Sequence, residues 1–105
     1  MLKRLIFASL FILPALPAMA ASDDAWAQFA AEVEQGCLTA TRGMLENATA
    51  TVDPFGSESY GLAIVSGEVG EGQPAAVLCV FDKQSKAVQV GGELAITVTQ
   101  NEQGL

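Results

Sequence analysis

Histidine is absent from this 105-residue sequence, and basic residues are scarce. Without histidine, the chain can form neither a Ser-His-Asp triad nor a metal site with imidazole ligands. Lysine and arginine number 5 against 12 aspartates and glutamates, which gives a net charge of −7. Nucleic acids and anionic lipid surfaces are recognised through basic patches. We therefore expect no nucleic-acid partner.

Long apolar runs are also missing, except at the beginning of the chain. Residues 1–4 carry two basic side chains, residues 5–16 are almost all apolar, and residues 17–20 end in Ala-Met-Ala. This order is typical of a secretory signal peptide. The apolar run is shorter than the about 20 residues that span a bilayer, so we expect cleavage rather than a membrane anchor. Cleavage is predicted after Ala20, with Ala21 as the alternative.

Removal of the signal would leave residues 21–105, which we interpret as one small domain. The signal contains Lys3 and Arg4, so the mature net charge would be −9 rather than −7. The short signal and the small size suit a bacterial export substrate, which predicts a periplasmic or secreted protein. No later run is long enough to anchor the mature chain stably in a membrane. Residues 100–105 are expected to fray.

The sequence has only two cysteines, Cys37 and Cys79. In an oxidising compartment such a pair normally forms a disulfide. It would close a loop of about 40 residues and stabilise the fold by about 4 kcal/mol in the chain-entropy model. A redox role lacks the Cys-x-x-Cys spacing that lowers a thiol pKa, and a metal site lacks two further ligands. We predict a structural disulfide.

Residues 23–46 are predicted to form an amphipathic helix. Asp23 and Asp24 suit its first turn, where negative charge meets the helix dipole. Apolar and small residues recur at steps of three and four, as on one helix face. This stripe contains Trp26, Phe29, Ala30, Val33, Cys37, Ala40, Thr41 and Met44. Gly36 and Gly43 weaken the helix, so we expect it to bend or to end early.

Shorter segments after the helix predict β-strands. They are residues 49–53, 60–65, 75–81 and 87–90, with 94–99 as an edge strand. Residues 75–81 are apolar on both faces, as in a central strand. Short links between strands favour antiparallel neighbours. The expected fold is α+β, with one N-terminal helix packed on a small antiparallel sheet of three to five strands and one helix-to-sheet disulfide.

Polar and turn-forming residues are densest in residues 53–60. The candidate binding residues of this contact loop are Asp53, Phe55, Ser57, Glu58 and Tyr60. Loops on a rigid scaffold often carry binding residues, so we interpret the segment as a contact surface together with the open face of the sheet. Phe55 and Tyr60 would be its anchors. The alternative is a turn between two strands, with Phe55 closing the end of the core.

Two further chemistries use the carboxylates. Asp53 and Glu58 would form an acid/base pair in a small hydrolase. The same two acids, with Glu68 and Glu71, would offer oxygen ligands to calcium, although the sequence has no EF-hand loop. A calcium or small-ligand binding module and a carboxylate-dependent hydrolase are therefore the alternatives to the main prediction.

The main prediction is a small, exported, acidic protein that acts without catalysis. It would be a binding or accessory module in the bacterial cell envelope, with no cofactor and no metal. A mature charge of −9 favours a basic envelope protein as partner and an association that weakens with salt.

Export and oxidation make a joint prediction for the intact protein. The exported chain should have the mass of residues 21–105 less two hydrogens, and reduction should lower its melting temperature strongly. Mass spectrometry and thermal unfolding with and without reductant measure both. Free thiols with unchanged stability would contradict the structural disulfide.

Overall fold

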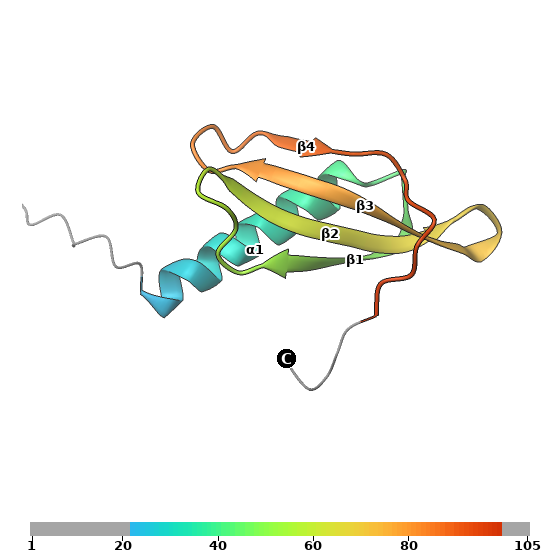
Figure 1. The fold of residues 1–105 in the computed structure, drawn as a ribbon, viewed down its shortest axis with the longest axis horizontal. Helices are drawn as coiled ribbons and strands as arrows, with labels where there is room; N and C mark the ends of the chain where they lie inside the picture. Colours follow the sequence, from blue (N-terminus) through green and yellow to red (C-terminus); the bar gives the residue numbers. More distant parts are fainter. Residues whose placement is uncertain (1–21, 100–105) are drawn as a thin grey trace, which may run out of the picture.

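The structure is a computed structural model and describes residues 22–99. It contains one layer of helix and one sheet (Figure 1). The elements are α1 (Asp23–Ala40), β1 (Glu46–Asp53), β2 (Tyr60–Val69), the 3-10 helix η1 (Gly70–Gly72), β3 (Gln73–Asp82) and β4 (Val88–Val90). The sheet order is β1-β2-β3-β4, and neighbouring strands are antiparallel. The expected fold class is confirmed. The predicted signal and residues 100–105, which were expected to fray, lie outside the described residues.

The helix begins as predicted but ends six residues early. The Ser22 side chain accepts a hydrogen bond from the Ala25 backbone N–H and caps the first turn. At the other end, the Thr41 hydroxyl donates to the carbonyl of Cys37, and Gly43 has a φ of +85° that turns the chain away. Ala40, which the helical stripe placed in the core, is exposed as a result.

One face of the sheet forms the core with α1, and we call it the inner face. Val33 and Cys37 of the helix are fully buried there. They pack against alternate residues of the central strands, namely Ala63, Val65, Ala75, Val77, Cys79 and Phe81. Cys37 and Cys79 form the predicted disulfide, with their Cα atoms 6.0 Å apart. The predicted bond between helix and sheet is therefore confirmed.

Gly61 sets how closely the helix approaches the sheet. A Cβ atom at this position would lie 2.5 Å from Cγ2 of Val33 and 3.0 Å from Cζ of Phe29. Both distances are shorter than ordinary carbon contacts. The missing side chain thus leaves the space that α1 occupies.

The β2–β3 hairpin is longer than the sequence indicated. The predicted strands ended at residue 65 and began again at residue 75, but Gly67 pairs with Ala75 and Val69 pairs with Gln73. The reversal is confined to η1, where Glu71 and Gly72 have φ angles of 64° and 72°. Backbone pairing continues along both strands because it does not depend on the side chains.

The predicted edge strand at residues 94–99 is wrong. Leu94 forms one bridge with Ala76 on β3, and the chain then crosses the sheet toward β1 (Figure 1). The glycine pair before this segment ends β4, and of the described residues after β4 only Gly91 and Leu94 still form backbone hydrogen bonds with β3. Ala76 is 1% exposed, at the level where the segment crosses the sheet.

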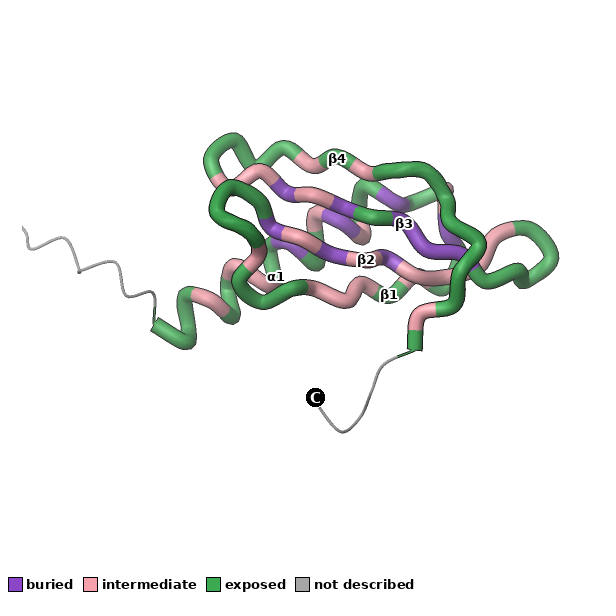
Figure 2. Tube along the Cα trace, in the orientation of Figure 1, coloured by how far each residue is buried: buried purple, intermediate pink, exposed green. Residues whose placement is uncertain are grey.

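β3 is a central strand, but the face of β3 that points away from α1 is buried over only part of its length. Leu78, expected in the core, is 55% exposed, and Val80 is half-buried. Figure 2 shows exposed and intermediate stretches between the buried positions of β3. The reason is that α1 covers the inner face only. The face opposite α1, which we call the outer face, has no helix over it within residues 22–99.

The close approach of α1 at Gly61 predicts that any side chain added at this position lowers the stability of the protein. Gly61→Ala should destabilise the protein by about 1–3 kcal/mol, because the β-branched Val33 has little freedom to move away. Gly70→Ala is the matched control, since a Cβ atom there meets nothing within 4 Å, and it should change stability by less than about 0.5 kcal/mol. Urea unfolding measures both variants. Equal effects would contradict the packing described at Gly61.

Candidate functional site

Residues 53–60 form a loop that its own side chains hold in place. Oδ1 of Asp53 accepts hydrogen bonds of 3.0 Å from the backbone N–H groups of Phe55 and Gly56. The Ser57 hydroxyl and the Ser57 backbone N–H both donate to the carbonyl of Tyr60, and the Tyr60 N–H donates back to the hydroxyl. Asp53 and Ser57, two of the five predicted binding residues, thus shape the loop.

Lys83 attaches this loop to the end of the core. Its Nζ donates to the carbonyls of Phe55 at 3.0 Å and Ser57 at 2.6 Å. The same ammonium lies 5.6 Å from the ring centroid of Trp26 and 5.2 Å from that of Phe29. These are cation–π distances. One cation therefore joins the loop to the aromatic end of α1.

Phe55 combines the packing expected of a residue that closes the core with the exposure expected of a binding residue. Its ring packs edge-on against Trp26, with centroids 5.1 Å apart, so it helps to close the end of the core. It is nevertheless 56% exposed, and Tyr60 is 44% exposed. Glu58 is exposed at the tip of the same loop. The structure brings the five residues together in one rigid loop, and their binding role stays a prediction.

The acids at this end of the sheet are held in the charged form. The N–H groups of Phe55 and then Gly56 lower the pKa of Asp53, and the charge of Lys83 contributes further. The N–H groups of Ser85 and Gln84 lower the pKa of Asp82. A general acid needs a raised pKa, so the direction of the Asp53 shift favours a structural role over acid catalysis.

The outer face carries a cluster of apolar side chains beside the loop. It consists of Leu62 and Ile64 on β2 and Leu78 and Val80 on β3, and we call these four residues the apolar patch. Strand pairing sets Leu62 opposite Val80 and Ile64 opposite Leu78, so the four side chains are neighbours. They line a shallow hollow of about 440 Å³ with Thr51 and Asp53 of β1 at its border.

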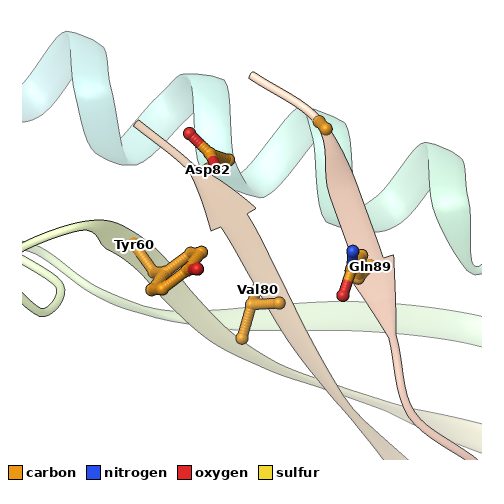
Figure 3. Close-up of a pocket in the computed structure, with 5 residues that line it drawn as sticks. Tyr60, Val80, Asp82 and Gln89 are labelled. Atoms are coloured by element: carbon orange, nitrogen blue, oxygen red, sulfur yellow. The ribbon is translucent and has the colours of Figure 1, made fainter. Parts of the chain in front are cut away.

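A second hollow, of about 150 Å³, continues the patch toward the end of the sheet (Figure 3). Tyr60, Val80, Asp82 and Gln89 line it from three strands. Val80 borders both hollows, so the tyrosine ring extends the apolar patch. The open sheet face was predicted from the sequence, but the patch residues were not, because both faces of residues 75–81 were expected to be buried. The alternation of apolar residues in both strands was the available signal.

The charge around the patch has one sign. Asp53 and Asp82 lie at one end of the outer face, and Glu68 lies farther along β2 on the same side by alternation. No basic residue of the described chain lines either hollow, although the charge of Lys83 acts on Asp53. Lys86 pairs with Glu32 of α1 at 2.8 Å, Lys83 binds the loop, and Arg42 lies in the turn after α1.

Residues 22–99 contain neither a metal-binding cluster nor a membrane-spanning helix. No three His, Cys, Asp or Glu side chains in this range are arranged to hold a metal ion. No helix in the same range has the length and apolar character of a membrane span. Comparison of the chain with protein-family models, with curated proteins and with solved structures gave no match.

The lowered pKa of Asp53 predicts a pH-dependent contribution to stability. A carboxyl whose pKa is lower in the folded state stabilises the fold above its unfolded pKa, near 3.8, and loses that contribution as the pH falls through the folded pKa. Asp53→Asn keeps an acceptor oxygen but loses the charge. It should be less stable than the parent at pH 7, and the difference should shrink below about pH 4.

Urea unfolding between pH 7 and pH 2 tests this expectation, with Glu58→Gln in the same loop as the control. The control should follow the parent at every pH. A stability difference for Asp53→Asn that persists unchanged at the lowest pH would contradict the assigned role of the charge.

Proposed function

We propose that this chain is an exported, non-enzymatic binding module that recognises a basic protein of the bacterial cell envelope. The observation that supports the proposal is the apolar patch, which lies open on the outer face with carboxylates beside it. Leu78 is exposed and Leu62, Ile64 and Val80 are half-buried. Apolar side chains that gather on one open face of a small protein are typical of an interaction surface. The contact surface comprises this patch and the adjoining loop of residues 53–60.

The scaffold under this surface is well suited to binding. The Cys37–Cys79 bond links the helix to β3, the strand that carries half of the patch. Lys83 and Asp53 fix the loop beside it. A surface that is ordered before binding loses less conformational entropy on association, which favours affinity.

Charge supports a basic partner. The carboxylates of the outer face and the predicted mature charge of −9 attract a positively charged protein and repel acidic ones. Such attraction raises the rate of encounter and is screened by salt.

The proposal predicts capture of a basic envelope protein that depends on charge. Immobilised residues 21–105 would be incubated with envelope extract at about 50 mM and about 500 mM salt, and bound proteins identified by mass spectrometry. We expect one saturable basic partner, bound more weakly at the higher salt concentration. The purified partner would then be titrated calorimetrically.

Two charge-reversal variants locate the contact. Glu58→Lys in the loop should weaken binding, because it places a cation in the proposed surface. Glu34→Lys on α1 makes the same change of charge on an exposed residue of the opposite layer, and it should bind as the parent does. Absence of any saturable partner at low salt, or equal loss in both variants, would contradict the proposal.

A further inference from the structure

We infer that the partner presents a short amphipathic helix with basic residues beside its apolar stripe, and that this helix lies on the outer face over β2 and β3. The inference rests on the proposed function and specifies which part of the surface is occupied and by what kind of segment. On the outer face the partner helix would occupy the position that α1 has on the inner face.

The central strands themselves indicate a second layer. β2 and β3 carry apolar residues on both faces, a pattern typical of a sheet that is covered on each side. The inner residues Ala63, Val65 and Val77 are buried by α1. On the outer face Leu78 is 55% exposed, and Leu94 and Ile96 of the crossing segment are 45% and 47% exposed. In α+β folds a helix covers an apolar sheet face, as α1 covers the inner face here.

The length of the open apolar strip fits a short helix. From Tyr60 to Ile64 the strip runs four residues along β2, about 13 Å. A helix of about nine residues has the same length and presents three apolar side chains at steps of three and four. Beyond Ile64 the strip meets the crossing segment, whose residues 96–98 border Thr49 and Ser66. This segment bounds the space available to the partner helix.

The carboxylates of the outer face indicate which residues lie beside the apolar stripe of the partner helix. Glu68 lies beyond Ile64, where the crossing segment bounds the strip, so the carboxylates at the strip itself are those of Asp53 and Asp82 at its Tyr60 end. The pKa of each aspartate is lowered, so both are ionised at neutral pH. Lysine or arginine residues beside the apolar stripe would approach these carboxylates. A second copy of this chain would bring like charges together, which disfavours pairing of two outer faces.

A synthetic peptide tests the inference directly. The probe has about 14 residues, with leucine on one helical face and lysine on the other. It would be titrated into residues 21–105, with ¹⁵N–¹H chemical shifts and far-ultraviolet circular dichroism as readouts. We expect saturable binding, shift changes centred on the apolar patch, and a gain of helix in the peptide. A peptide of the same composition in scrambled order, and one with glutamate for lysine, should not bind.

Two variants of the chain separate packing from charge. Leu78→Ser removes an exposed apolar side chain with little effect on folding and should weaken peptide binding at least about tenfold. Gln89→Lys adds a cation to the outer face beside Val80 and should also weaken binding. Thermal unfolding of both variants should match the parent within a few degrees.

Several results would overturn the inference. They are absence of saturable peptide binding, binding that Leu78→Ser leaves unchanged, and binding without gain of helix. A concentration-dependent dimer that Leu78→Ser abolishes would assign the patch to a second copy. A tighter peptide complex on deletion of residues 100–105 would instead assign it to the chain's own end. If Leu78→Ser still captures the envelope partner while Phe55→Ser does not, the proposed function stands and the helix site is wrong.

Discussion

The packing of one helix against one face of the sheet is the constraint on which the other features depend. α1 reaches the sheet closely because Gly61 has no side chain, and the Cys37–Cys79 bond keeps it there. With the chain's only described α-helix used on the inner face, the outer face has no matching cover. The apolar patch on β2 and β3 thus stays open because α1 packs on the other face of the same strands.

Different structural elements border the two ends of the outer face. At one end, Lys83 donates hydrogen bonds to carbonyls of the 53–60 loop. Its ammonium group also forms cation–π contacts with the rings of Trp26 and Phe29. At the other end, the segment after β4 crosses the sheet. Both ends are ordered by hydrogen bonds and packing, and the apolar centre lies between them. An apolar centre with a polar loop at one end and the crossing segment at the other resembles the arrangement of protein–protein contact surfaces.

Sequence reasoning reached the fold because its signals came from local periodicity. The stripe containing Val33 and Cys37 predicted the helix face, and the presence of only two cysteines in an exported chain predicted the disulfide. The end of α1 was missed because a side-chain hydrogen bond from Thr41 and the positive φ of Gly43 decide it. The exposure of Leu78 was missed because apolar alternation shows which side chains share a face and not whether another element covers that face. The role of Lys83 was missed because its contacts join residues 26 to 28 positions apart.

The disulfide also divides the chain into a covalent ring and two arms. The ring runs from Cys37 to Cys79 and contains β1, β2 and most of β3, with the 53–60 loop and the η1 tip as its exposed parts. A protease that cuts once at either exposed site opens the ring without releasing a fragment, because the two pieces stay joined through sulfur. In a compartment rich in proteases, the exposed turns of this protein can therefore be nicked while the sheet keeps all of its strands.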